Sequence, residues 1–125
     1  MPERDETLRA VREHLDEAHA AADRLVEEAR SLEAAGAFSV VLELIPAAVS
    51  RRVTEAVRIP TIGIGAGVGC DGQVLVLHDL LGLNDAFTPK FLKRYAAMGQ
   101  EARDAVRRFR DEVRDGTYPD DAHSF

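Results

Sequence analysis

Glu43 is the residue of this sequence whose type and position most clearly indicate chemistry. It is the only charged residue between Phe38 and Pro46, a run dominated by Val and Leu. Such a run is typical of a buried parallel strand, where an ionisable side chain is uncommon unless it is paired or functional. An apolar neighbourhood raises the pKa of a carboxyl group toward values useful for a general base. The residues alone therefore leave two roles open for Glu43: a general base, or a structural carboxylate bonded to a neighbouring strand or helix.

A glycine-rich segment is the second candidate for a functional role. It alternates glycine with other residues at four positions: Gly63, Gly65, Gly67 and Gly69. Bare backbone approaches a ligand closely or holds an anion on N–H groups, and alternating glycine also suits a tight corner between strands. The dinucleotide-binding pattern is not supported, because no clear helix opens here and no acidic residue follows at the expected distance. The histidines form no metal-binding set: His14, His19, His78 and His123.

The elements that must position these residues follow from hydrophobic periodicity. From about residue 6 to residue 35, apolar residues recur at spacings of three and four, which predicts one long helix that ends at Gly36. This seam suits a helix laid on a sheet or a coiled coil, and its small alanines favour the first. Residues 47–57 predict a crossover helix. The apolar runs at 38–44 and 61–65 then form parallel strands joined by a right-handed connection.

The second half of the chain predicts one more strand and two helices. The run at 73–78 begins only about eight residues after the previous strand, whereas parallel connections usually need a dozen or more, so spacing alone is compatible with a hairpin. A loop is expected at 80–86. Thr88 and Pro89 then suit the N-cap and first position of a helix that reaches about Met98. A last helix is expected at 100–115, ended by Gly116 and followed by an extended tail.

Several motifs, taken in order, resemble the C-terminal half of the ketopantoate hydroxymethyltransferase family. They are Leu32-Glu33-Ala34-Ala35-Gly36-Ala37, Val41-Leu42-Glu43 before Pro46, Ile62-Gly63-Ile64-Gly65-Ala66-Gly67, Asp71-Gly72-Gln73-Val74-Leu75-Val76, His78-Asp79 and His123-Ser124-Phe125. The resemblance covers residues 20–125 and leaves residues 1–19 as a helical extension. It implies an α/β fold: the C-terminal part of a (β/α)8 TIM-type barrel, with three parallel strands, a long N-terminal helix and C-terminal helices. We expect a single partial-barrel domain over residues 1–125, in which the short connection joins parallel strands.

The resemblance also implies a reaction. The family transfers a hydroxymethyl group from 5,10-methylenetetrahydrofolate to 3-methyl-2-oxobutanoate, giving 2-dehydropantoate in pantothenate biosynthesis, and the residue matching Glu43 removes a proton from C3 of the 2-oxo acid. Gly65 and Gly67 are expected to form a wall of the substrate cavity. His78, at the end of the third expected strand, is a candidate cavity residue or a structural hydrogen-bonding group. The family holds Mg²⁺ with acidic residues on earlier strands that have no counterpart in this sequence, so no metal ligand is expected here.

Two functions stay open on the sequence alone. The chain is either half of an enzyme that needs a complementing N-terminal half, or a non-catalytic barrel remnant that serves as an assembly or regulatory interaction module. Three strands of a barrel leave open edges, and open edges of apolar strands recruit other chains. We therefore expect a homo-oligomer or a complex with the complementing half, rather than a stable monomer.

Composition limits the remaining classes. The chain has 125 residues, of which 46% are hydrophobic and 30% charged, as is typical of one soluble globular domain. A net charge of −6 disfavours nucleic acids and anionic membrane surfaces as partners. Cys70 is the only cysteine, which excludes an internal disulfide and suits a reducing compartment. The charged N-terminus and the lack of a long apolar run lead us to expect a cytoplasmic protein.

Overall fold

The computed structural model describes residues 2–84, 86 and 88–125 of the chain. Backbone contacts divide the chain into two compact units, one ending at Val74 and the other beginning at Leu75. The single partial-barrel domain expected over residues 1–125 therefore stays a prediction.

The first unit begins with the long helix that the apolar seam predicted, α1 (Pro2–Ala34). Its C-terminal part contributes three buried residues to the core: Ala22, Val26 and Ala29. Leu8, on the same seam, is 59% exposed. Gly36 ends the helix with a φ of 94°, and the N–H of Ala37 donates to the carbonyl of Leu32 (3.0 Å), a glycine-dependent helix stop. The later part of α1 thus agrees with the first of the two interpretations of the seam, a helix laid on a sheet.

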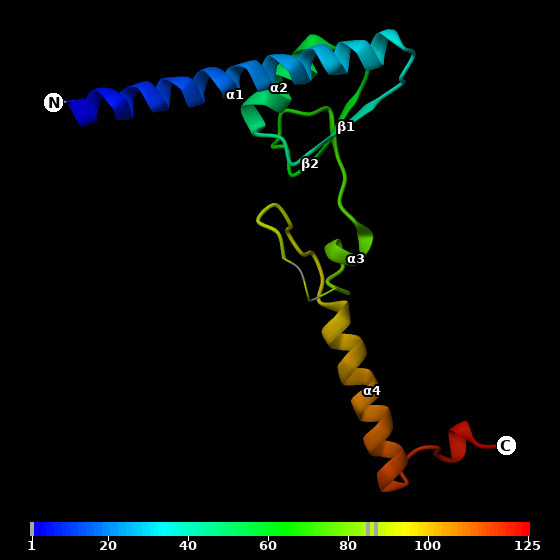
Figure 1. The fold of residues 1–125 in the computed structure, drawn as a ribbon. Coiled ribbons are helices and arrows are strands. Elements are labelled where there is room, and N and C mark those ends of the chain that lie inside the picture. Colours follow the sequence, from blue (N-terminus) through cyan, green and yellow to red (C-terminus); the bar gives the residue numbers. More distant parts are fainter. Residues whose placement is uncertain (1, 85, 87) are drawn as a thin grey trace. The chain divides into compact units, whose positions relative to one another are not determined.

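Three short parallel strands form the sheet of this unit. They are β1 (Val40–Glu43), β2 (Thr61–Ile64) and β3 (Gly72–Gln73), in that spatial order. The predicted α/β class with three parallel strands is confirmed, and so is the parallel pairing across the short connection. Helix α2 (Ala47–Ala56) links β1 to β2 and lies beside α1 (Figure 1). An open sheet of this kind is what part of a TIM-type barrel contains, and the barrel itself stays a prediction.

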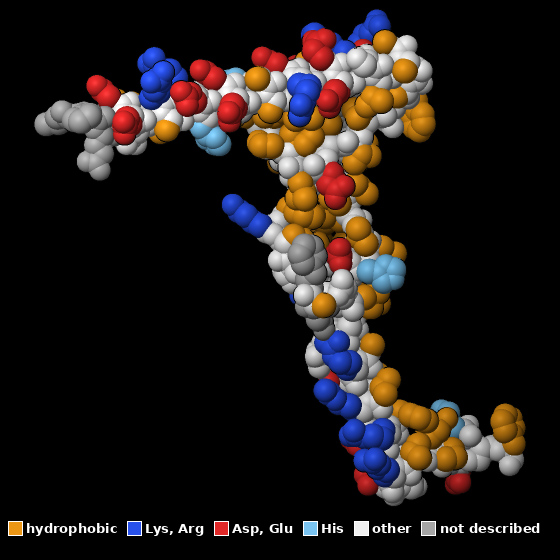
Figure 2. Space-filling view, in the orientation of Figure 1, with side chains coloured by type: hydrophobic (Ala, Val, Ile, Leu, Met, Phe, Trp, Pro, Cys, Tyr) orange, Lys and Arg blue, Asp and Glu red, His pale blue; other side chains and the backbone are white. Residues whose placement is uncertain are grey.

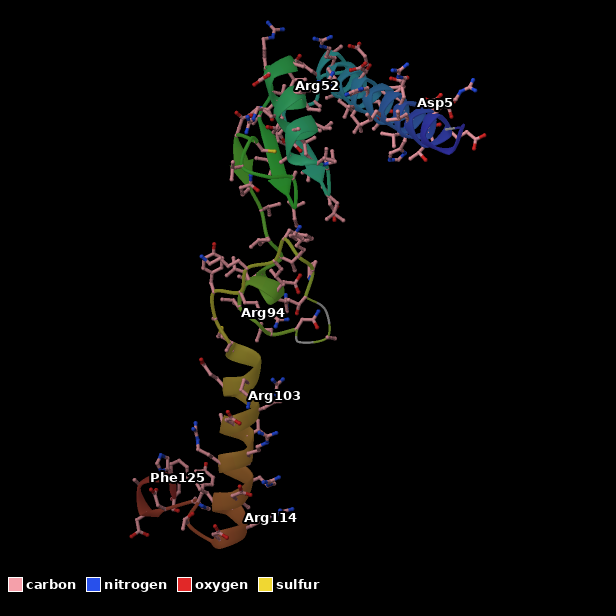
Figure 3. The ribbon with its side chains drawn as sticks, turned by 90° about the vertical axis from the view of Figure 1, so that its left-hand side faces the viewer. Asp5, Arg52, Arg94, Arg103, Arg114 and Phe125 are labelled. Carbon is pink, nitrogen blue, oxygen red and sulfur yellow. The ribbon has the colours of Figure 1, made fainter. Side chains whose placement is uncertain are left out.

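The core lies between the two helices and one face of the sheet. Leu42 points toward the helices and is 4% exposed, together with the buried Val53 of α2. Arg52 of α2, labelled in Figure 3, pairs with Asp23 of α1 at the edge of this layer. Val41, on the opposite face of β1, is 59% exposed. The expectation of a buried strand is therefore met on one face only, because the described residues leave the second face largely uncovered.

The third strand is shorter than predicted. The sequence predicted it at 73–78, but β3 ends at Gln73. Its partner strand β2 ends at Ile64, and Gly65 then turns away with a φ of 64°. The N–H of Val74 still donates to the carbonyl of Gly63 (3.0 Å), but residues beyond it have no β2 backbone left to pair with.

The second unit contains a short helix, α3 (Leu77–Leu80), and a long one, α4 (Met98–Asp115). The helix predicted from Thr88 to Met98 is wrong, since the described residues there form turns and irregular structure. The N–H groups of Tyr95, Met98 and Gly99 instead donate to the carbonyls of residues 80, 81 and 82, at 2.9, 3.1 and 3.1 Å. The amide of Tyr95 is therefore not available for a helical bond within the predicted segment, whereas Met98 and Gly99 lie in the first turn of α4, where amides have no partner in the helix. Of the predicted loop at 80–86, Leu80 belongs to α3 and Asp85 lies outside the described residues.

The last helix agrees with its prediction, while the tail does not. Gly116 ends α4 with a φ of 74°. The tail predicted as extended forms a short 3-10 turn, η1 (Asp121–His123), because the Asp120 carboxylate accepts the N–H of His123 (3.0 Å). Hydrophobic side chains line one side of α4, with Val106 67% and Phe109 55% exposed (Figure 2). None of the helices in the described part of the chain is long and apolar enough to cross a membrane.

Candidate active site

The carboxyl ends of β1 and β2 lie side by side and carry the candidate base. Glu43 is in register with Ile64, and the N–H of Leu44 donates to the carbonyl of Ile64 (2.9 Å). In parallel α/β sheets, functional groups gather at this edge because the loops that follow the strands meet there. The structure therefore places Glu43 where a catalytic side chain of this fold class is expected.

The surroundings of Glu43 differ from those that the sequence predicted. Glu43 lies two residues after Val41, so both side chains belong to the uncovered face of the sheet, and Glu43 is exposed. The expected apolar pocket is not formed by the described residues, because α1 and α2 pack on the other face. Glu43 also has no hydrogen-bond partner and no ion pair among the described residues, so the alternative of a structural carboxylate is not supported by them.

The backbone is strained directly after Glu43. Leu44 has a φ of 54°, a left-handed conformation that non-glycine residues rarely adopt and that costs on the order of 1–3 kcal/mol. This residue turns the chain from β1 toward Pro46, whose carbonyl accepts the N–H groups of Val49 and Ser50 in the first turn of α2 (2.8 and 3.0 Å). The turn fixes the direction in which the chain leaves Glu43, and strain of this kind often accompanies functional residues.

The connection between β2 and β3, residues 65–71, packs against α2. Ala66 is fully buried in the core, at 0% exposure. A Cβ on Gly67 would lie 2.4 Å from the Cβ of Ala47, and Gly67 has a φ of 78°. Glycine is therefore required at Gly67 for close approach to the helix, whatever else the residue does. The cavity wall expected from Gly65 and Gly67 stays a prediction.

Two side chains that the sequence analysis did not single out anchor this connection. The Asp71 carboxylate accepts the backbone N–H of Thr61 (2.8 Å) and its hydroxyl (3.0 Å). These two bonds, the backbone one first, lower the pKa of the Asp71 carboxyl below its ordinary value. The Gln73 side-chain amide donates to the carbonyl of Gly67 (2.9 Å). The available signal was the motif Asp71-Gly72-Gln73, whose polar side chains next to a glycine are typical of side-chain bonds to a nearby turn.

His78 is not at the end of a strand. It lies in α3 and is exposed, because β3 ends five positions earlier, at Gln73. The strand-end position expected for His78 is therefore wrong. It belongs to the second unit, whereas Glu43, Gly65 and Gly67 belong to the first. A role for His78 in a substrate cavity stays a prediction.

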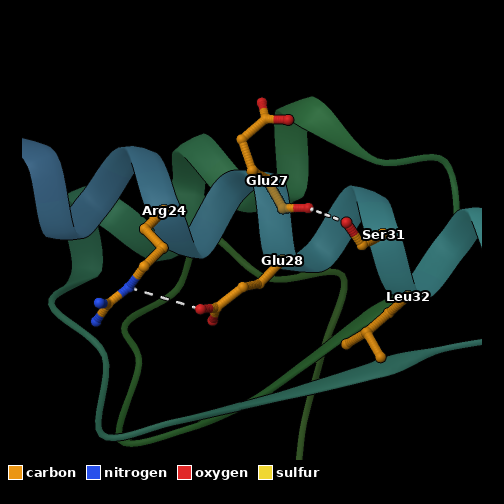
Figure 4. A pocket seen from close by; sticks show the side chains of 5 residues that line it. All are labelled: Arg24, Glu27, Glu28, Ser31 and Leu32. Atoms are coloured by element: carbon orange, nitrogen blue, oxygen red, sulfur yellow. Dashed lines mark hydrogen bonds and ion pairs between the residues drawn. The ribbon is translucent and has the colours of Figure 1, made fainter.

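The described residues contain no metal cluster, and one open pocket lies on α1. No group of three His, Cys, Asp or Glu side chains among them could hold a metal ion. One open pocket of about 530 Å³ is lined by residues of α1 alone (Figure 4). Its polar groups bond to one another: Arg24 pairs with Glu28 (3.6 Å) and the Ser31 hydroxyl donates to the carbonyl of Glu27 (2.8 Å). This pocket is a surface feature of α1, and it does not involve Glu43.

Comparison with known proteins establishes the family. The sequence model of the ketopantoate hydroxymethyltransferase family matches residues 3–121. The chain belongs to this family. It is 57% identical over 106 residues to the 3-methyl-2-oxobutanoate hydroxymethyltransferase of Syntrophus aciditrophicus (strain SB), covering 85% of this chain and 39% of that protein. The protein of the same name from Oleidesulfovibrio alaskensis is 59% identical over 106 residues, covering 85% of this chain and 37% of its own length.

The match is high in identity but short relative to the family's proteins. A third relative, the 3-methyl-2-oxobutanoate hydroxymethyltransferase of Anaeromyxobacter sp. (strain Fw109-5), is 57% identical over 104 residues, which are 83% of this chain and 34% of the relative. The chain thus spans less than two fifths of the length of these curated relatives. The resemblance inferred from the motifs is confirmed, and the ketopantoate hydroxymethyltransferases are a family of enzymes. The family match begins at residue 3, and the boundary drawn at residues 19 and 20 stays a prediction.

Proposed function

We propose that this chain supplies the general base for hydroxymethyl transfer from 5,10-methylenetetrahydrofolate to 3-methyl-2-oxobutanoate. The observation that carries the proposal is the position of Glu43, at the carboxyl end of β1 and on the face of the sheet that α1 and α2 leave uncovered, in a chain of this family. The chain covers 39% or less of its curated relatives, so the reaction requires the part of the family's proteins that lies outside the match. The product is 2-dehydropantoate, and the proposed location is the cytoplasm.

The proposed role of Glu43 is one proton transfer. Its carboxylate accepts the proton from C3 of the 2-oxo acid, and the electron pair of the broken C–H bond forms the enolate. Water hydrolyses the methylene bridge of the folate, which breaks both of its C–N bonds and gives formaldehyde and tetrahydrofolate. The enolate carbon then bonds to the formaldehyde carbon, and the formaldehyde oxygen takes up a proton to become the hydroxyl of the product. The segment outside the match closes the uncovered face, which removes water from the surroundings of Glu43.

Magnesium does not fit the described residues. No group of three or more His, Cys, Asp or Glu side chains among them could hold a metal ion, and hard divalent cations require several oxygen ligands. We therefore assign the Mg²⁺ ligands to the part of the family's proteins outside the match. No step of the reaction is derived through the metal for this chain.

The free edge of the sheet and the exposed apolar side chains near it support binding of a second chain. In the order β1, β2, β3, strand β1 lies at the edge, so one side of its backbone has no neighbouring strand in this sheet. Val41 is 59% exposed and Leu44 65% exposed, and both would lose water-exposed apolar area under a neighbouring strand. We propose that the occupant is the complementing part of the barrel or a second copy of the chain.

The test is complementation. The 125-residue chain is mixed or co-expressed with the segment of a curated relative that lies N-terminal to the match, and formation of 2-dehydropantoate is measured with Mg²⁺ and the folate co-substrate. We expect no turnover by the chain alone and measurable turnover by the complex. Glu43→Gln keeps the side-chain volume but cannot accept the proton, and should lower kcat by about 10²–10⁴. The matched control Glu55→Gln, on the exposed side of α2, should leave kcat unchanged.

Two results would contradict the proposal in different ways. Near-full activity of Glu43→Gln in the complex would remove Glu43 from the role of base. A folded complex of the two parts that makes no product would favour the alternative, a barrel remnant that serves assembly or regulation.

A further inference from the structure

We infer that Gln73 is a positioning residue that fixes the connection between β2 and β3 and, through it, the backbone that carries Glu43. The hydrogen bond of Gln73 is observed in the structure whatever the function of the chain, and only its effect on catalysis rests on the proposed function. Residues 65–71 join two parallel strands with far fewer residues than such a connection normally uses. A connection this short has no helix to hold it, so its shape depends on individual side-chain bonds.

A glycine on the neighbouring strand, Gly63, leaves space for the side-chain amide of Gln73. Gln73 is in register with Gly63, and its side-chain amide reaches the carbonyl of Gly67 (2.9 Å). A Cβ on Gly63 would lie 3.0 Å from both polar atoms of that amide and 2.9 Å from the Sγ of Cys70. Gly63 therefore leaves the space in which the Gln73 amide lies. The amide nitrogen is the group that must face Gly67, because a carbonyl oxygen only accepts hydrogen bonds.

Gly67 links the hydrogen bond of Gln73 to the backbone that carries Glu43. Gly67 is packed so closely against Ala47 that a methyl group would not fit between them. Ala47 is the first residue of α2, three residues after the strained Leu44. Gly67 and Ala47 are both exposed, but their close contact leaves no free space between them, so a shift of Gly67 toward α2 moves the start of that helix and the turn that leaves Glu43. Among the described residues no side chain holds the Glu43 carboxylate, so its position depends on this backbone.

A second anchor separates the role of Gln73 from general stability. Asp71 and Thr61 hold the far end of the connection, beside the start of β2, through three hydrogen bonds of their own. Loss of the Gln73 bond therefore leaves the end of the connection attached and frees its middle, near Ala47. We expect a misplaced base with intact substrate binding, which lowers kcat by about tenfold while KM for the 2-oxo acid changes less than twofold.

The first experiment does not depend on activity. Cys70, the only cysteine, lies in this connection and is partly buried against the core, so its rate of reaction with a thiol reagent such as DTNB at one fixed pH reports opening of the segment. Gln73→Met keeps the length of the side chain and removes the donor, and should raise that rate by about fivefold. Gln100→Met, the same change at the other glutamine of the chain, should leave the rate unchanged. An unchanged rate in Gln73→Met would overturn the inference.

The second experiment uses the complemented enzyme. Gln73→Met should lower kcat with little change in KM, whereas Gln73→Lys, whose ammonium group can donate to the carbonyl of Gly67, should recover most of the loss. A Gln73→Lys variant no better than Gln73→Met would overturn the positioning role, because the loss would then not come from the missing donor. If the unaltered complex makes no product, the proposed function fails, and the thiol rates still decide whether Gln73 holds the connection.

Discussion

Thr61→Val tests whether the hydrogen-bond network at the start of β2 stabilises the first unit. Thr61 is fully buried, at 0% exposure. Its hydroxyl lies 3.0 Å from the Asp71 carboxylate and 2.8 Å from the Thr54 hydroxyl, and it accepts the N–H of Asp71 (3.2 Å). Valine has nearly the same shape but neither donates nor accepts. The substitution therefore removes the three contacts of the hydroxyl without opening a cavity, and it keeps the bond from the backbone N–H of residue 61 to Asp71.

The expected loss follows from these contacts. Each hydrogen bond of a buried hydroxyl contributes about 1 kcal/mol net, and the methyl group of valine recovers part of the loss by its own burial. We expect Thr61→Val to lower the free energy of unfolding by about 2 kcal/mol, a large share of the roughly 5–15 kcal/mol of a typical domain. Thr61→Ser keeps the hydroxyl and loses one buried methyl group, which costs about 1 kcal/mol. The valine variant should therefore be the less stable of the two.

The assay is urea unfolding at a fixed protein concentration and neutral pH, followed by pulse labelling of Cys70. This probe reports the first unit alone, whereas both tyrosines, Tyr95 and Tyr118, belong to the second and the chain has no Trp. A loss of about 2 kcal/mol with a slope of about 1–3 kcal/mol per molar urea moves the midpoint by roughly 1 M. A Thr61→Val midpoint equal to or above that of Thr61→Ser would refute the reasoning, because packing and not the network would then decide stability at this site.

Three further predictions concern the turns, the pH dependence and the assembly. Gly67→Ala should destabilise the chain by more than about 2 kcal/mol in urea unfolding, because the new Cβ would lie 2.4 Å from the Cβ of Ala47. Gly36→Ala, also at positive φ but with open space around it, should cost only about 1–2 kcal/mol. Equal losses would mean that the contact with Ala47 is not tight. Because Thr61 lowers the pKa of Asp71 in the folded state, the stability that this carboxylate contributes is present above its unfolded pKa of about 3.9 and is lost as pH falls through the lower folded value. Between pH 5 and pH 2 the urea midpoint of Asp71→Asn should therefore fall less than that of the unaltered chain. Parallel curves of midpoint against pH for the two proteins would contradict this. Sedimentation at micromolar concentration should show association of the chain with itself, and a compact monomer of 13.7 kDa with low binding of a hydrophobic dye would contradict the open-face interpretation.

Local patterns predicted the elements whose signals lie within a few neighbouring residues. The seam of α1, the stop at Gly36 and the end of α4 at Gly116 need only side-chain periodicity and a glycine at positive φ, and all three appear in the structure. The position of Glu43 at the end of an apolar run was also evident from the sequence, since the run and the following Pro46 bound the strand. The parallel pairing of β2 and β3 required the family resemblance, because their spacing also fits a hairpin.

The sequence by itself determined where α1 and α4 end, where α2 and the first two strands lie, and which carboxylate stands at a strand end. Tertiary structure alone decided the length of β3, which ends where β2 has no more backbone to pair, and the loss of the helix expected after Thr88, whose following amides bond to residues 80–82. It also decided the exposure of Glu43 and the bonds of Asp71 and Gln73. The physical reason is the same in each case: propensity acts along the chain, whereas hydrogen-bond partners and burial come from segments that only the folded backbone brings together.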